Sequence, residues 1–232
     1  MIRRLAIPPL LAVATGAVLL LSGCSADPLN IIILNARAPG DKCDFKDATL
    51  YVEGGAVDFT PWQDVNGNFG QTTSYFQAFS WENQLQPNPI SVNGQVTDPG
   101  GGNDFIGDTI VYEYQYTDPS VVLASETQNV RAVISAGGLP TNNYMGADLI
   151  QPKAALALDN TLGPAAQTLL VTFQMFGKTS SGASKHTNKA SFPVTVYKLN
   201  TTTVSCPSGY KLFTTSCGIP GRDASVYCVK SG

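Results

Sequence analysis

Residues 108–117, DTIVYEYQYT, show the clearest alternation of apolar and polar side chains in the sequence. Read as an extended strand, this stretch gathers four apolar or aromatic side chains on one face, those of Ile110, Tyr112, Tyr114 and Tyr116. The opposite face carries Val111, Glu113, Gln115 and Thr117. Such alternation predicts a strand that packs one face against a core and presents the other face to solvent.

Two later segments repeat this alternation. Residues 167–177 place Leu169, Val171, Phe173 and Met175 on one face, and residues 191–199 do the same with Phe192, Val194 and Val196. The polar stretch 178–190 between them predicts a hairpin with a long loop. Residues 31–34 read as a first strand, and residues 48–59 as a strand region broken at Gly54-Gly55. Residues 86–104 are loop-rich, and the best helical pattern, 144–158, is cut by Pro152.

Short alternating segments separated by Gly, Pro and Asn predict an all-β protein, an antiparallel β-sandwich that is immunoglobulin-like in general architecture. We expect the sandwich over residues 31–200. Residues 201–232 form a Cys-rich tail, which we expect to be tied by disulfides and packed on the sandwich. Residues 1–23 and 24–30 have a different character, described below.

The charge balance excludes one class of partner. Arg3 and Arg4 lie in the segment that we expect to be removed, so the 14 basic residues fall to 12 against 17 acidic ones, a formal net charge of −5. A net negative chain is a poor ligand for nucleic acid and does not adhere by charge to anionic lipid.

The first 23 residues predict export. Two arginines precede an apolar run from Leu5 to Leu21, which contains Pro8-Pro9 and is short for a membrane span. Leu21-Ser22-Gly23-Cys24 then resembles the lipobox of bacterial lipoproteins. That resemblance implies cleavage between Gly23 and Cys24, acylation of Cys24 and a lipidated tether over 24–30; the alternative is an ordinary signal peptide with a stray cysteine. Several acyl chains hold a protein stably on a membrane. By the same resemblance, Ser25 favours the outer membrane, with the body facing the periplasm or the cell surface.

Four further cysteines follow this export signal: Cys43, Cys206, Cys217 and Cys228. An even number in an exported chain predicts two disulfides, and three pairings are possible. We favour Cys43–Cys206 with Cys217–Cys228. The alternative, a zinc site, fits these spacings poorly.

Residues 59–81 hold both tryptophans and seven of the aromatic residues. Exposed rings beside Asn and Gln would suit a carbohydrate or peptidoglycan, with Trp62, Tyr75 and Trp81 as the candidate ligand-binding residues. The alternative is that these rings fill one end of the core.

Signals for metal or catalysis are weak, and we assign no metal, no cofactor and no catalytic residue. The stretch 64–70, DVNGNFG, half-matches a calcium loop but supplies one carboxylate, Asp64. His186 is the only histidine, and no G-x-S-x-G is present. An envelope hydrolase that uses His186 with nearby acids stays an alternative.

Three stretches suggest a relative: 75–85, 176–197 and 217–228. They resemble bacterial lipoproteins of unassigned function. In that group a cysteine pair often follows the last sandwich strand, whereas Lys198-Leu199-Asn200 stands there in this chain. The resemblance implies a lipid-anchored envelope protein and no particular activity. The sequence therefore predicts a non-enzymatic protein that is structural or binds a ligand, with a glycan or an envelope protein as possible partner.

Overall fold

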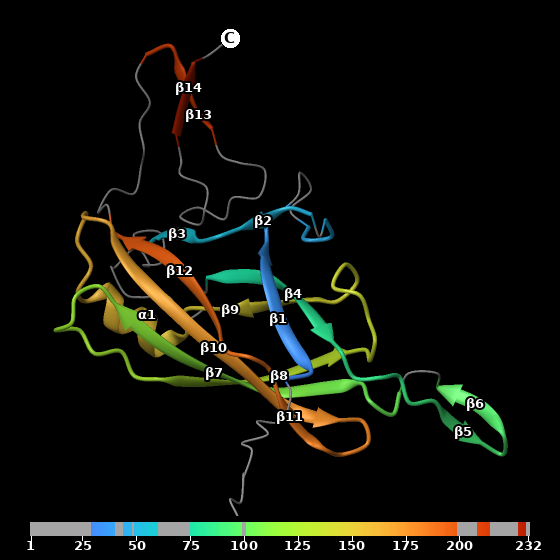
Figure 1. The fold of residues 1–232 in the computed structure, drawn as a ribbon. Coiled ribbons are helices and arrows are strands. Elements are labelled where there is room, and N and C mark those ends of the chain that lie inside the picture. Colours follow the sequence, from blue (N-terminus) through green and yellow to red (C-terminus); the bar gives the residue numbers. More distant parts are fainter. Residues whose placement is uncertain are drawn as a thin grey trace, which may run out of the picture.

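Two facing β-sheets form the body of the protein (Figure 1). The computed structural model describes residues 29–39, 44–47, 49–59, 75–98, 101–198, 208–213 and 227–230. The four-stranded sheet has the order β2 (Tyr51–Val52), β1 (Ile31–Arg37), β4 (Phe76–Asn83) and β9 (Tyr144–Asp148). The second sheet has the order β3 (Gly55–Asp58), β12 (Ala190–Tyr197), β10 (Gln167–Thr179), β7 (Phe105–Tyr116) and β8 (Glu126–Ile134), and β11 (Ser184–His186) pairs with β10.

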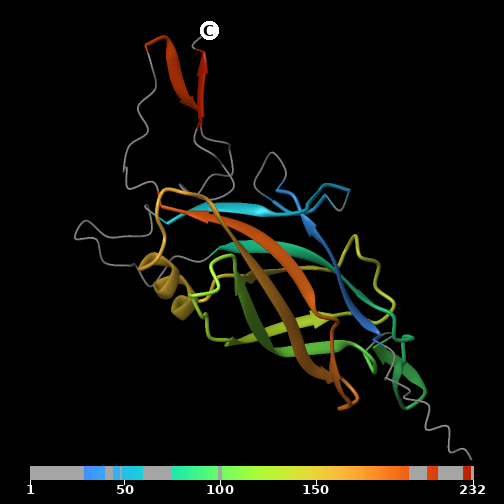
Figure 2. The same cartoon turned by 60° about the vertical axis from the view of Figure 1, so that its left-hand side comes forward.

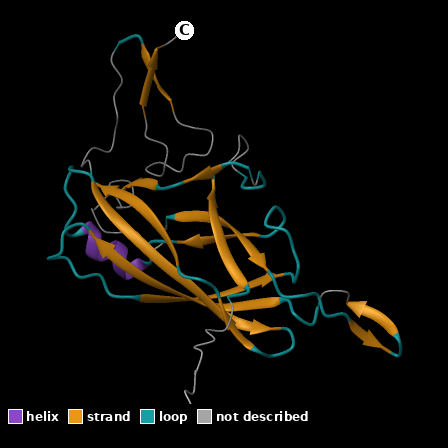
Figure 3. Ribbon diagram, viewed as in Figure 1, coloured by secondary structure: helices purple, strands orange, loops and turns teal. Residues whose placement is uncertain are grey.

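The predicted all-β sandwich is confirmed. Strands dominate the described residues, which contain one short helix (Figure 3), and Figure 2 shows the two sheets from a second side. In β7 the inward positions Ile110 and Tyr112 are fully buried, whereas Glu113 between Tyr112 and Tyr114 is exposed. The alternation read from the sequence therefore corresponds to the two faces of this strand.

An aromatic cluster joins the two sheets. The Phe79 ring of β4 lies 4.8 Å from the Phe173 ring of β10 and 5.8 Å from the Phe192 ring of β12, measured between centroids. All three side chains are buried. Full burial of one such ring stabilises a fold by about 1.5–3 kcal/mol, so this cluster is a main source of the attraction between the sheets.

The segment 48–59 passes from one sheet to the other. β2 belongs to the four-stranded sheet and β3 to the second sheet, so the break expected near Gly54 is the crossing point. A Cβ at Gly54 would lie 3.0 Å from the carbonyl oxygen of Pro193, which explains the need for glycine there. β3 runs parallel to β12, whereas the other paired strands of the two sheets are antiparallel.

Three elements differ from the sequence expectation. Pro152 begins the helix α1 (Pro152–Asp159) and does not cut one, because proline at the first helical position removes an N–H that has no partner there. The loop-rich stretch 86–104 contains a hairpin of β5 (Ile90–Val92) and β6 (Gln95–Asp98). The connection 178–190 contains β11, which folds back onto β10.

Residues of the predicted tail form a further hairpin of β13 (Tyr210–Phe213) and β14 (Tyr227–Lys230). Figures 1 and 2 show it standing away from the two main sheets. The packing predicted for the tail stays a prediction, since most of residues 201–232 lie outside the described ranges. In the described part of the chain, no helix has the length and apolar character needed to cross a membrane.

Candidate ligand-binding cavity

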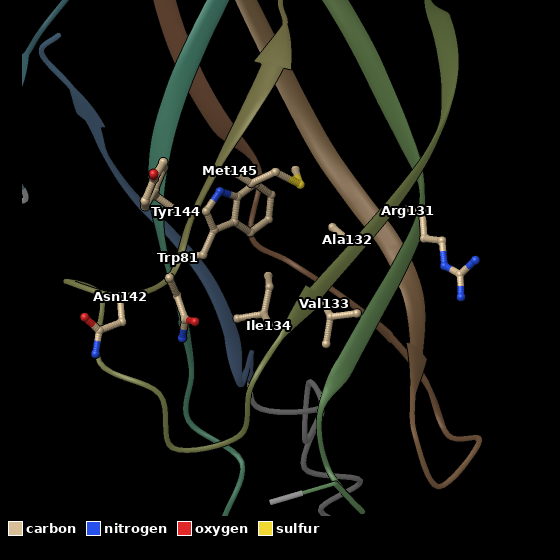
Figure 4. Close-up of a pocket in the computed structure, with 9 residues that line it drawn as sticks. Trp81, Arg131, Ala132, Val133, Ile134, Asn142, Tyr144 and Met145 are labelled. Carbon is tan, nitrogen blue, oxygen red and sulfur yellow. The ribbon is translucent and has the colours of Figure 1, made fainter. Parts of the chain in front are cut away.

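A cavity of about 250 Å³ opens between the edge strands β8 and β9 (Figure 4). Each strand is the last of its sheet, and both edges lie on the same side of the sandwich. Trp81, from β4, lines the cavity between these edges. The other lining residues are Arg131, Ala132, Val133, Ile134, Asn142, Asn143, Tyr144 and Met145.

Trp81 is fully buried, with 0% of its surface exposed. Its backbone is held on both sides: it pairs with Ile33 of β1, and its N–H donates to the carbonyl oxygen of Asn143 at 2.9 Å. Its indole Nε1, however, is buried and has no hydrogen-bond partner. Figure 4 shows the ring between the strand of Tyr144 and Met145 and the strand of Ala132 and Ile134.

Asn143 carries a second buried donor without a hydrogen-bond partner, its Nδ2. Leaving one buried donor without an acceptor typically costs about 1–3 kcal/mol, and folded proteins rarely leave such groups unpaired. Trp81 Nε1 and Asn143 Nδ2 are the two buried side-chain atoms without partners among the described residues, and both belong to residues that line this cavity.

The wall that carries Asn143 is held by a buried cation, Arg37. Arg37 is 0% exposed, and its Nε donates to the Ser80 hydroxyl at 2.8 Å. One terminal nitrogen donates to the Phe45 carbonyl at 2.7 Å, and the other to the Thr141 carbonyl at 3.2 Å. Arg37 therefore joins β1 to two loops, one of which leads directly into the cavity wall.

Burial lowers the pKa of the Arg37 guanidinium, and electrostatic interactions with Tyr144 and Asp47 oppose that shift. A guanidinium still stays protonated in proteins. Because its donors already contact a hydroxyl and backbone carbonyls, the fold itself satisfies this cation.

The inner lining of the cavity is neutral. Among the described residues that line it, none is acidic, and the one cation is Arg131. Figure 4 shows the Arg131 guanidinium pointing away from Trp81. The cavity thus offers apolar walls, from Ile134 and Met145, next to two buried N–H donors without partners. Such an arrangement suits an uncharged molecule with oxygen acceptors.

Of the expected aromatic platform, two rings are buried. Trp81 and Tyr75 are both 0% exposed, and the Tyr75 ring lies 6.5 Å from the Phe192 ring inside the core. The expectation that these two rings stack on a glycan at the surface is therefore wrong, because their faces are covered by the sandwich. Trp62 lies outside the described residues.

The remaining predicted sites fall largely outside the described ranges. Gly23, Cys24, Cys43, Cys206 and Cys217 all do so. The backbone of Cys228 is part of β14, where it pairs with Leu212, but its side chain is not described. The predicted lipidation and the predicted disulfides stay predictions.

His186 is exposed on β11. Its Nδ1 lies 3.0 Å from Gln174 Nε2 and 3.0 Å from the Thr187 carbonyl oxygen. Within the described ranges, neither a carboxylate nor a nucleophilic hydroxyl is among its hydrogen-bond partners, so this geometry does not support the hydrolase alternative. The described ranges also contain no group of three His, Cys, Asp or Glu side chains placed to hold a metal ion.

Comparison of the chain with protein families, with curated proteins and with solved structures finds no match. The geometry of the cavity is therefore the observation that indicates a site. Sequence reasoning selected Trp81 but missed Arg37 and Asn143. The sequence does contain one signal for Arg37. It is the only charged residue in the strand IIILNAR, and this indicates that its side chain forms polar contacts inside the protein.

Proposed function

We propose that this chain is an exported lipoprotein, anchored through Cys24, whose sandwich binds a small oxygen-rich ligand in the cavity between β8 and β9. The proposed role is binding and not catalysis. The observation that carries the binding role is the pair of buried donors, Trp81 Nε1 and Asn143 Nδ2, that lack acceptors beside one cavity. A ligand with two oxygen acceptors would satisfy both once the two side chains turn toward the cavity.

The volume limits the ligand. A water molecule occupies about 30 Å³ in the liquid, so a cavity of about 250 Å³ holds about eight waters or one molecule of monosaccharide size. The neutral inner lining favours an uncharged molecule, because an ion would leave water without a partner of opposite charge. One sugar unit of an envelope glycan fits both conditions. In this proposal the indole N–H of Trp81 donates a hydrogen bond to the sugar, whereas the sequence suggested that the face of the ring stacks on the sugar.

The anchor rests on the order of charge, apolar run and lipobox in residues 3–24. β1 begins at Ile31, a few residues after Cys24, so the sandwich would stand close to the membrane. Ser25 after the cysteine favours the outer membrane. The resemblance to bacterial lipoproteins of unassigned function points the same way.

The binding role is tested with the full chain in detergent by following the two indole N–H resonances in proton–nitrogen NMR spectra. The panel contains neutral monosaccharides, acetamido sugars and, for comparison, amino acids. A ligand that occupies the cavity shifts the Trp81 indole proton downfield, because a new hydrogen bond forms. Trp62→Phe assigns the two resonances and serves as the matched control, since it removes the other indole.

Trp81→Phe and Asn143→Leu should each weaken binding at least tenfold, which corresponds to about 1.4 kcal/mol for a lost donor. Trp62→Phe should leave the affinity unchanged. If no sugar in the panel moves the Trp81 resonance, or if Trp81→Phe binds as well as the unchanged protein, the cavity holds water only and the proposed binding role is wrong.

A further inference from the structure

The hairpin of β5 and β6 projects from the sandwich as a separate two-stranded sheet. Asn93 and Gly94 form its turn, with positive φ angles of 52° and 80°. Two such residues in succession are typical of the tight type I′ turn, whose twist matches that of the flanking strands. The Asn93-Gly94 turn thus favours the hairpin through local sequence alone, independently of packing in the sandwich core.

The hairpin exposes three aliphatic side chains, and its one charged residue is Asp98 at the end of β6. Every described side chain from 86 to 97 is exposed, and no residue from 84 to 97 carries a charge. Ile90, Val92 and Val96 are 44%, 55% and 59% exposed. Ile90 and Val92 lie on one face, and Val96, which pairs with Ser91, lies on the other. An isolated two-stranded hairpin is marginally stable in water. We therefore expect these apolar side chains to pack against another surface.

The hairpin lies at the end of the sandwich where the chain enters β1. Gln84, just before the hairpin, donates its N–H to the carbonyl oxygen of Asn30 at 2.7 Å. On its other side, Asn88 forms a β-bridge with Gly101. Figures 1 and 2 both show β5 and β6 at the same end of the sandwich as the start of β1.

Two lysines lie at the same end. The turn between β10 and β11 contacts the base of the hairpin, because Ser181 donates its N–H to the carbonyl oxygen of Gly102 at 3.1 Å. Lys178 and Lys185 flank that turn on β10 and β11. An apolar element with lysines beside it is typical of surfaces that meet a bilayer.

We propose that the β5–β6 hairpin lies in the headgroup region of the membrane to which Cys24 is attached. This inference rests on the proposed lipid anchor. Five residues lie between Cys24 and Asn30, and the six steps from one Cα atom to the next span at most about 20 Å when the chain is fully extended. The anchor therefore holds this end of the sandwich, and with it the hairpin, beside the lipid.

The depth of contact follows from the backbone. The outer edges of β5 and β6 carry N–H and C=O groups that pair with no third strand among the described residues. Such groups are costly in the hydrocarbon core, where water is absent. The hairpin consequently lies among the headgroups, where its valines reach the acyl boundary and its edges stay hydrated. This contact would orient the cavity relative to the membrane.

The test uses the full-length acylated protein in vesicles of phosphatidylethanolamine and phosphatidylglycerol. The photoreactive residue p-benzoylphenylalanine replaces Val92, and in a matched control it replaces Val122. Val122 is 87% exposed and lies beyond the far end of β7, a strand of twelve residues that spans about 40 Å. After irradiation, mass spectrometry identifies what each position has captured.

The proposal predicts that position 92 captures lipid severalfold more often than position 122. Capture of a second copy of the chain at position 92, or no adduct there, overturns it. The intact mass is measured first, so that the two proposals fail separately. A chain without acyl groups overturns the anchor, whereas an acylated chain whose position 92 captures no lipid overturns the hairpin contact alone.

Discussion

The guanidinium carbon of Arg37 lies 4.4 Å from the centroid of the Tyr144 ring. At this distance the cation is attracted to the face of the ring. Tyr144 follows directly on Asn143, which supplies one of the two donors without partners. The buried cation of β1 therefore holds in place the strand end that forms the cavity wall.

Arg37→Met should lower the free energy of unfolding by about 3–5 kcal/mol, because it removes a buried cation and leaves its carbonyl acceptors unpaired. Urea unfolding followed by circular dichroism measures this loss. Arg37→Lys is the matched variant: it keeps the charge but cannot reach acceptors on two loops at once, so we expect an intermediate loss. A loss below about 1 kcal/mol for Arg37→Met would contradict the role given to this side chain.

Trp81→Phe should change the stability little, by about 1 kcal/mol or less, because removal of an unpaired donor offsets part of the lost packing. Phe79→Ala is the comparison: it empties the centre of the aromatic cluster and should cost about 3–5 kcal/mol. Thermal and urea unfolding of both variants measure the difference. If Trp81→Phe costs as much as Phe79→Ala, the indole nitrogen has a partner in the free protein.

The Lys198–Asp159 pair closes the sandwich at the end of α1. Lys198 Nζ lies 2.9 Å from Asp159 Oδ1, and the two side chains are 13% and 9% exposed. Lys198→Met should lower the free energy of unfolding by about 1–3 kcal/mol, because it removes a charged donor to the Asp159 carboxylate. The double variant Lys198→Met with Asp159→Leu should recover most of that loss in urea unfolding. A double variant no more stable than the single one would show that the pair is not the cause.

Tyr112 and Tyr114 make the fold sensitive to alkali. Burial raises the pKa of both phenols above the ordinary value of 10.0. The unfolded chain loses these protons near pH 10 while the folded chain keeps them, so the stability that they contribute is complete below pH 10 and falls above it. The free energy of unfolding should drop by about 1.4 kcal/mol per pH unit for each phenol.

Urea unfolding at several pH values up to about 12 measures this slope. A variant with Phe at both positions should lose less stability per pH unit than the unchanged protein. Phenolate absorbance provides the decisive check. If all tyrosines ionise near pH 10 in the folded protein, these two side chains are not shielded as described.

The long strands could be predicted from the sequence, whereas the short ones could not. β7 and β10 are long enough for alternation to be visible, since one face of each packs in the core. β5 and β11 have three residues each and show no such pattern. Asn93-Gly94 is a hairpin signal, but the surrounding glycines and prolines obscured it.

The cavity could be predicted only in part. Trp81 stood out by type, but its place inside the sandwich depends on pairing between β1, β4 and β9, segments far apart in the chain. Arg37 carries a visible charge, yet its acceptors are mainly backbone carbonyls, which any residue supplies. The identity of such partners is set by the tertiary fold and leaves no trace in residue type.

The intact mass of the protein purified from the membrane fraction shows whether Cys24 holds this sandwich on a membrane. We expect a chain that begins at Cys24 and carries acyl groups on that residue. A chain that begins elsewhere, that retains residues 1–23 or that has an unmodified Cys24 would contradict it.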